Sequence, residues 1–283
     1  MEPAEIGRQA LVPLRVMEAA FFDLDKTIIS RSSSLALSRP MYRAGMVTRG
    51  QLVRGAYAQL VYALVGADEK RMDRLKHGML ALTKGWEQTE VENLVRDVII
   101  EVIDPFVYQE ALDLMKLHRA EGRRVFIVSS SPEEVVRPLA SHFGVTDVIA
   151  TRARIVDGRY TGELEFYCYG QAKADEIRAI AKRRKIDLAG SYAYSDSITD
   201  LPMLEAVGHP IAVNPDRDLR RQAEARGWKL RDFRRPVRLR TRIVRTATQP
   251  KTRVAAGVAA AVAAAAILGY LVIRSRTAAR EAA

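Results

Sequence analysis

The chain has 283 residues, of which 48% are hydrophobic and 28% are charged, values that are ordinary for one or two globular domains with a core. Its single cysteine, Cys168, excludes an intrachain disulfide and suits a reducing compartment, and the segment Met1–Arg8 lacks the pattern of a secretory signal. The net charge is +11, and much of the excess follows Arg217, beside an uncharged apolar run, which favours anionic lipid over nucleic acid as a partner.

The first expected strand, Val16–Phe22, follows a loose lead-in and runs into Asp23-Leu24-Asp25-Lys26-Thr27. Ligands of open α/β sheets bind beyond the carboxyl ends of the strands. Because residues i and i+2 of an extended segment point the same way, we expect Asp23 and Asp25 to face one pocket. Two carboxylates this close repel, which raises one pKa unless a cation neutralises them. A metal site, an acid/base pair, or both are therefore open.

Residues 32–104 show helical spacing and few strand signals, with breaks at Gly66, Gly85 and Asp104-Pro105. We expect a small helical bundle, a cap, inserted after the first strand. The apolar positions that recur at helical intervals are Leu52, Ala56, Leu60, Ala63 and Leu64, then Met72, Leu75, Met79 and Leu82, then Val91, Leu94, Val95 and Val98.

Beyond the cap, strands alternate with helices, which predicts an α/β fold: a Rossmann-like, mostly parallel sheet core over residues 1–31 and 105–233, with the inserted helical cap. A helix is expected to start at Pro132, capped by Ser131. The other expected elements are a helix over Phe106–Ala120, strands over Arg124–Val128 and Asp147–Thr151, a hairpin at Asp157-Gly158 within Arg154–Phe166, a helix over Gln171–Arg184, strands over Ser191–Tyr194 and Ile211–Val213, and a helix after Asn214-Pro215.

Four polar clusters follow in order, each at an expected strand end or helix start. They are Asp23-Leu24-Asp25-Lys26-Thr27, then Ser129, then Lys173, then Ser195-Asp196-Ser197-Ile198-Thr199-Asp200. Each cluster by itself also fits a helix cap, a turn or a solvated lysine. Their order and placement together favour one shared site.

Together these clusters resemble the motifs of the haloacid dehalogenase superfamily of phosphohydrolases, over about Val16–Phe233. The resemblance is closest to the phosphoserine-phosphatase-like branch of subfamily I, which carries a helical cap between its first two motifs. It implies that Asp23 is a nucleophile that forms an aspartyl-phosphate. It implies that Asp25 protonates the leaving oxygen and then activates water, and that Ser129 and Lys173 hold the phosphoryl oxygens.

The same resemblance implies a magnesium site formed by Asp23, Asp196 and the backbone carbonyl of Asp25, with Thr27 and Asp200 in support. Magnesium takes oxygen ligands and is usually held by one or two carboxylates plus substrate phosphate. To act first as an acid, Asp25 needs a pKa above that of Asp23.

Three residues depart from the family pattern. Lys26 and Ser195 stand where many relatives have glycine. Ser32 stands about where phosphoserine phosphatases have a glutamate that binds the substrate amino group. The last difference puts phosphoserine in doubt as a substrate.

A tail rich in arginine closes the sequence. Residues 234–253 form a basic linker without aspartate or glutamate, and residues 254–273 form an uncharged, alanine-rich run long enough to span a bilayer. The stronger basic flank precedes the run, which predicts a single-pass protein of the cytoplasmic membrane with its catalytic domain in the cytoplasm. The alternative is an alanine-rich soluble helix packed on the domain.

The sequence therefore predicts a magnesium-dependent phosphomonoester hydrolase that acts through an aspartyl-phosphate. The alternatives are a phosphotransferase to an alcohol acceptor and a membrane scaffold that has lost the chemistry. The expected partners are a small phosphorylated substrate, with a lipid-linked or membrane-proximal phosphate favoured by the tail, and the membrane itself, but no nucleic acid. The sequence leaves the oligomeric state open.

Overall fold

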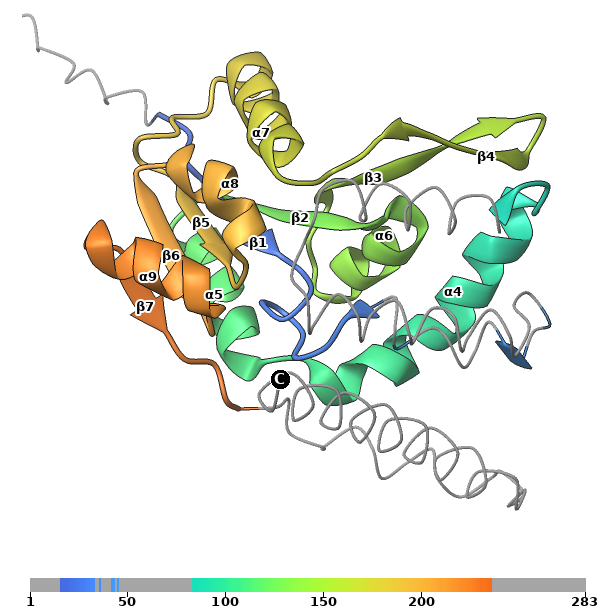
Figure 1. Ribbon diagram of the computed structural model, residues 1–283, viewed down its shortest axis with the longest axis horizontal. Coiled ribbons are helices and arrows are strands. Elements are labelled where there is room, and N and C mark those ends of the chain that lie inside the picture. The colour runs from blue at the N-terminus through green and yellow to red at the C-terminus, as the bar shows by residue number, and fades with distance from the viewer. Residues whose placement is uncertain (1–15, 34–35, 37–41, 44, 46–82, 236–283) are drawn as a thin grey trace, which may run out of the picture. The chain divides into compact units, whose positions relative to one another are not determined.

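The structure is a computed structural model, and it describes residues 16–33, 36, 42–43, 45 and 83–235 (Figure 1). These residues belong to one compact unit of the chain, residues 1–237. The first two apolar stretches of the predicted cap, most of the basic linker and the run 254–273 lie outside the described residues. Within the described ranges, no helix combines the length and the apolar character that a membrane span requires.

The core of the described unit is a seven-stranded sheet in the order β4-β3-β2-β1-β5-β6-β7. All neighbouring strands are parallel except β3 and β4, so the predicted mostly parallel sheet is confirmed. The strands are β1 (Ala19–Asp23), β2 (Arg124–Pro132), β3 (Asp147–Val156), β4 (Arg159–Phe166), β5 (Tyr192–Ser195), β6 (His209–Val213) and β7 (Lys229–Arg231).

Helices cover both faces of this sheet (Figure 1). Alternate residues of β1 enter different apolar clusters: Ala20 and Phe22 pack with α4, α5 and α6, whereas Ala19 and Phe21 pack with α7, α8 and α9. All five residues of β1 are buried, as expected for a central parallel strand. The helices are α4 (Gln88–Ile103), α5 (Gln109–Ala120), α6 (Glu133–His142), α7 (Gln171–Arg184), α8 (Leu201–Glu205) and α9 (Arg217–Ala225).

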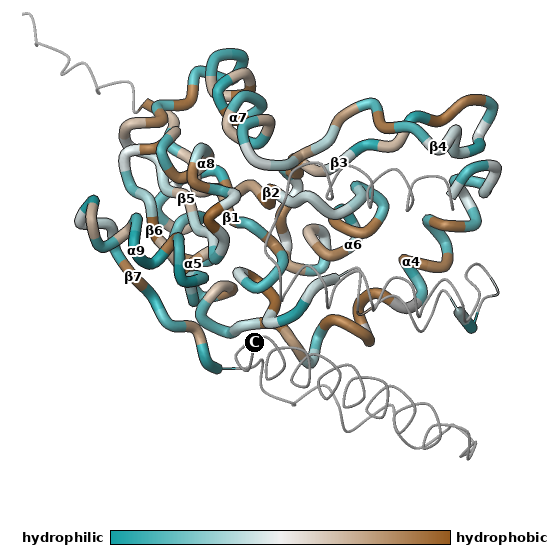
Figure 2. Tube along the Cα trace, in the orientation of Figure 1, coloured by the Kyte–Doolittle hydropathy of each residue, from teal (hydrophilic) through white to brown (hydrophobic). Residues whose placement is uncertain are grey.

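Helix α4 belongs to the described part of the predicted cap. Its hydrophobic residues recur along the helix (Figure 2), and the buried ones are Val91, Val95, Ile99 and Ile103. This stripe packs the helix against α6 of the sheet core. The cap boundaries at 32 and 104 stay a prediction.

The β3–β4 hairpin holds the chain that leads into α4. Asp157 and Gly158 both take positive φ, 49° and 72°, as the predicted two-residue hairpin turn requires. The tip then pairs with the start of α4 and with the residues before it, because Gln88 N donates to the carbonyl of Gly158 at 2.9 Å and Tyr160 N donates to that of Trp86 at 3.1 Å.

Several predicted boundaries were wrong for local reasons. Strand β1 starts at Ala19, and Val16 and Met17 before it are exposed. The helix expected from Phe106 starts at Gln109, after a separate 3-10 turn over Asp104–Phe106. Pairing with β4 extends β3 to Val156, and the short, exposed β7 was not predicted.

The predicted cap of α6 is a further correction. Strand β2 continues to Pro132, the helix starts at Glu133, and no side chain caps it. The hydroxyl of Ser131 instead donates to Asp25 Oδ2 at 2.9 Å. A long-range hydrogen bond has thus replaced the local one that the sequence suggested.

A buried histidine of α5, His118, connects this helix to the sheet. His118 Nε2 lies 2.8 Å from the hydroxyl of Tyr194, and its Nδ1 lies 3.3 Å from Arg123 Nη1. Tyr194 in turn stacks on Phe22, with ring centroids 4.3 Å apart. Burial and then the charge of Arg123 lower the pKa of His118 to about 4.

This histidine predicts a pH-dependent stability. Its folded pKa lies below the ordinary value, so the unfolded state binds the proton more tightly and stability falls as pH drops from about 6.5 towards 4. Between pH 7.5 and pH 5 the wild type should lose about 2 kcal/mol of unfolding free energy more than His118→Gln, whose amide does not titrate. Urea unfolding at both pH values measures the difference, and equal losses in the two proteins would contradict the assignment.

Candidate functional site

Parallel register brings the predicted residues to one edge of the sheet. Asp23, the last residue of β1, lies opposite Val128 of β2, so Ser129 follows at the same level. Phe22 lies opposite Tyr194 of β5, which brings Ser195 level with Asp23 on the other side. Ligands of such sheets bind at this edge.

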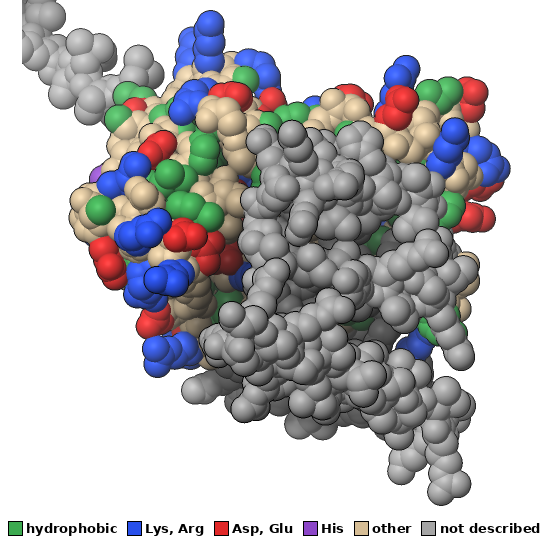
Figure 3. Space-filling view, viewed as in Figure 1, with side chains coloured by type: hydrophobic (Ala, Val, Ile, Leu, Met, Phe, Trp, Pro, Cys, Tyr) green, Lys and Arg blue, Asp and Glu red, His purple; other side chains and the backbone are tan. Residues whose placement is uncertain are grey.

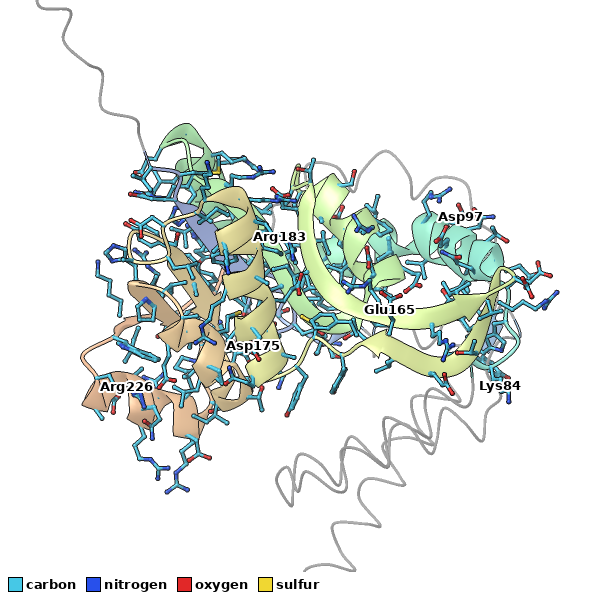
Figure 4. All side chains as sticks on the ribbon, turned by 90° about the horizontal axis from the view of Figure 1, so that it is seen from above. Lys84, Asp97, Glu165, Asp175, Arg183 and Arg226 are labelled. Carbon is cyan, nitrogen blue, oxygen red and sulfur yellow. The ribbon has the colours of Figure 1, made fainter. Side chains whose placement is uncertain are left out.

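A buried lysine links α7 to the end of β1 and to the loop after β5. Lys173 Nζ donates to Asp23 Oδ1 at 2.7 Å and to Asp200 Oδ2 at 2.8 Å. The lysine is 2% exposed, which excludes a solvated lysine, whereas Asp175 and Arg183 of the same helix are exposed (Figure 4). It stands in the first turn of α7, where a cation is unfavourable, so the two carboxylates offset both the helix dipole and the loss of water.

The loop after β5 is held by hydroxyl and backbone groups. Ser195 Oγ donates to Asp200 Oδ2 at 2.7 Å, so the serine at this family glycine position anchors a site carboxylate. Thr27 Oγ1 lies 3.5 Å from Asp196 Oδ1, a long contact. Asp216, which sequence reasoning missed, accepts from Ile198 N and also caps α9 through Leu219 N, at 2.9 and 2.8 Å. Its position after Asn214-Pro215 was the available signal for this cap.

The carboxyl of Asp25 accepts hydrogen bonds from two serines. Ser33 N donates to Oδ1 at 2.6 Å, and the hydroxyl of Ser131 donates to Oδ2 at 2.9 Å. The predicted phosphate ligand Ser129 is buried, and its hydroxyl accepts from Ser131 N at 3.1 Å. Sequence reasoning missed Ser33 altogether and gave Ser131 a different role.

The turn after Asp25 explains one departure from the family pattern. Lys26 takes a φ of 63°, a left-handed conformation that glycine adopts without strain. A glycine at this position in many relatives is therefore expected from the backbone alone.

Burial sets the charge state of the carboxylates. It raises the pKa of Asp23 well above its ordinary value, an effect that Asp200 and Asp196 strengthen and Lys173 opposes. Burial also raises the pKa of Asp25, against hydrogen bonds from Ser33 and Ser131. The pKa of Asp196 rises to about 7 through burial and the charge of Asp200. Burial thus raises the pKa of both Asp23 and Asp25, and the expected order, with Asp25 above Asp23, stays a prediction.

The donor set of the predicted magnesium site consists of oxygen atoms only. Asp23 and Asp196 are both buried at the same sheet edge, and each feels the charge of Asp200. In the described part of the chain, no three His, Cys, Asp or Glu side chains converge on one point. The predicted set contains only two side-chain carboxylates, since its third ligand is the carbonyl of Asp25. Such oxygens fit magnesium better than zinc.

A separate cavity of about 300 Å³ lies between α5 and the chain after β7. No predicted site residue lines it, and in its wall Arg235 pairs with Glu110 at 3.2 Å. The lining residues are Glu110, Asp113, Leu114, Leu117, Arg231, Asp232, Phe233 and Arg235.

The chain resembles one described protein family and several known proteins. The family model of haloacid dehalogenase-like hydrolases matches residues 20–205. A probable phosphatase of Mycobacterium tuberculosis is 47% identical over 252 residues, which cover 89% of this chain and 88% of that protein. The phosphoserine phosphatase SerB1 of the same organism is 32% identical and covers 82% of this chain and 76% of its own length.

Among solved structures, a protein of unknown function from Bordetella pertussis superposes with a TM-score of 0.69 and 30% identity, over 77% of this chain and 99% of that one. Residues 20–205, which the family model matches, include the sheet edge that carries the described carboxylates and the lysine.

Proposed function

Because the chain belongs to the haloacid dehalogenase-like hydrolase family and is a phosphatase, we propose that it hydrolyses phosphomonoesters through an aspartyl-phosphate on Asp23. The observation that carries the proposal is the buried bridge from Lys173 to Asp23 and Asp200 at the end of β1. It presents a carboxylate nucleophile beside a fixed positive charge. Hydrolysis by this route needs the carboxylate to attack phosphorus and the positive charge to offset the negative charge of the phosphate.

The chemistry takes two displacements. A carboxylate oxygen of Asp23 attacks phosphorus, the bond to the leaving oxygen breaks, and Asp25 protonates that oxygen. Asp25, now ionised, then removes a proton from the water that attacks the phosphorus and releases Asp23 as a carboxylate. Ser129 and Lys173 bind phosphoryl oxygens and oppose the charge repulsion between the nucleophile and the substrate.

Magnesium is the cofactor that these residues suit. Asp23, Asp196 and the backbone carbonyl of Asp25 would hold it, with Asp200 and Thr27 in support. When bound, it would stabilise charge on the transferring phosphoryl group. The support is electrostatic: Asp23, Asp196 and Asp200 are all buried, Lys173 contacts Asp23 and Asp200, and Asp196 feels the charge of Asp200. A divalent cation would balance that excess of negative charge.

We set aside the alternative of a membrane scaffold that has lost the chemistry, because the chain is a phosphatase. The phosphotransferase alternative shares the aspartyl-phosphate and differs only in the acceptor. Product analysis with an added alcohol separates the two: transfer of the phosphate to the alcohol as the main outcome would overturn hydrolysis as the reaction.

Asp23→Asn should lower turnover of p-nitrophenyl phosphate by at least about a thousandfold, because the neutral amide removes the nucleophile. EDTA should abolish wild-type activity, and added magnesium should restore it. The matched control is Asp175→Asn, an exposed aspartate of α7, which should retain wild-type rates.

Melting temperatures with and without magnesium test metal binding separately from catalysis by Asp23. Magnesium should raise the melting temperature of the wild type and should not raise that of Asp196→Asn. Activity of Asp23→Asn, or indifference of the wild type to EDTA, would contradict the mechanism.

Free phosphoserine should not be the best substrate, although one relative is a phosphoserine phosphatase. Ser32 is partly buried and carries no charge for the substrate ammonium, which would lose water without a partner. Comparing kcat/KM for phosphoserine with that for phosphomonoesters lacking the amino group, phospholipid head groups included, measures the preference.

Ser32→Glu tests the same idea by adding a carboxylate for the substrate ammonium. The variant should raise the relative kcat/KM for phosphoserine by about tenfold, the effect of roughly 1.4 kcal/mol of added interaction. A wild type that prefers phosphoserine by a wide margin would refute the idea.

Membrane attachment through residues 254–273 is a separate proposal, and it rests on the sequence alone. The described surface before the tail is mixed: Lys and Arg side chains over α9 lie among Asp and Glu (Figure 3), as in the pair Arg221–Asp218 at 3.2 Å. If the run spans a bilayer, full-length protein should resist carbonate extraction, and a chain ending near Arg235 should be released. Release of the full-length protein by carbonate would favour an interfacial or soluble helix.

A further inference from the structure

Both oxygens of the Asp25 carboxyl are held, and the groups that hold them come from different parts of the chain. Ser33 N donates to Oδ1 at 2.6 Å, from the segment that enters the predicted cap. Ser131 Oγ donates to Oδ2 at 2.9 Å, from the end of β2. The hydroxyl of Ser33 lies 3.3 Å from Oδ2 and 2.8 Å from the hydroxyl of Ser131, which closes the network.

Such a network matters because the terminal torsion of aspartate is soft. Rotation of a carboxyl about χ2 has a broad, roughly two-fold profile, so an aspartate at a loop position does not keep one plane by itself. Proton transfer to a leaving oxygen requires that plane to be held within hydrogen-bond reach of the oxygen. Two anchors on different oxygens remove this freedom.

The serines are built into the core, since Ser33 is 0% and Ser131 is 4% exposed. Ser131 is itself oriented, because its backbone N–H donates to the hydroxyl of Ser129 at 3.1 Å. A buried hydroxyl that lost its partner would be costly, which makes the arrangement specific.

We infer that Ser33 and Ser131 are positioning residues that hold the Asp25 carboxyl in the plane required for proton transfer to the leaving oxygen. The inference rests on the proposed role of Asp25 in phosphomonoester hydrolysis. It adds two residues, one of them at the entry to the predicted cap, to a site otherwise assembled from strand ends and the start of α7.

The leaving group provides the test. An alkoxide has to be protonated as it departs, whereas p-nitrophenolate departs with little help from an acid. The ratio kcat/KM reports the step in which the leaving group departs, not the later hydrolysis of the aspartyl-phosphate. Ser131→Ala should therefore lower kcat/KM for an alkyl phosphate such as glycerol 2-phosphate by roughly 10- to 100-fold. It should lower that for p-nitrophenyl phosphate by less than about threefold.

Three further variants sharpen the experiment. Ser131→Thr keeps a hydroxyl and should restore most of the alkyl phosphate activity. Ser130→Ala is the matched control, because it removes a neighbouring hydroxyl and keeps the carbonyl that accepts from Thr151. Ser33→Ala keeps the backbone N–H, and its effect should be non-additive with that of Ser131→Ala, because the two hydroxyls share a hydrogen bond.

The outcomes are distinguishable. If the wild type shows no hydrolysis that depends on Asp23, the proposed function fails and the inference fails with it. If the wild type is active and the serine variants lower kcat/KM equally for both substrates, or for neither, the positioning role alone is overturned. Circular dichroism melting of each variant excludes loss of the fold as the cause.

Discussion

The contact between Lys173 and two aspartates is the interaction on which the rest of the site depends. A charged ammonium that is 2% exposed is tolerable only with good partners, and both Asp23 and Asp200 lie within 2.8 Å of it. These partners are 150 and 27 residues away along the chain. One ion therefore fixes the start of α7 against the end of β1 and against the loop after β5.

The sheet supplies the rigid base for this contact. Phe22, directly before the proposed nucleophile, stacks on Tyr194, which lies two residues before Asp196. Tyr194 is tied to His118 of α5 by its hydroxyl. The polar edge of the sheet thus lies next to an aromatic pair that links β1, β5 and α5, and the register of β1 and β5 brings Asp23 level with Ser195.

What could be predicted from the sequence follows the range of the forces involved. Periodic apolar runs and turn residues located most strands and the boundaries of α7, and the order of the motifs located Asp23, Lys173 and Asp196 at one edge. Serine is different, because it serves equally well as a helix cap, a turn residue or a long-range donor. The role of Ser131 was therefore misread and that of Ser33 missed. Asp216 shows the same limit, since a local cap signal says nothing of its second bond to Ile198.

The charge state of the two aspartates was beyond sequence reasoning for another reason: it depends on burial and on how many charges share one buried volume. Asp23 feels the charges of Lys173, Asp200 and Asp196, whereas Asp25 accepts hydrogen bonds from neutral serine groups and feels the charge of Lys173 less than those bonds. Burial raises the pKa of both carboxyls, whereas the proposed nucleophile has to be ionised and the proposed acid has to keep its proton. A cation bound at Asp23 and Asp196 would lower the pKa of both carboxyls and would act much less on Asp25 if only its backbone carbonyl faces the ion. In this arrangement a divalent cation would do more than bind phosphate, because it would also set which aspartate is ionised and which keeps its proton.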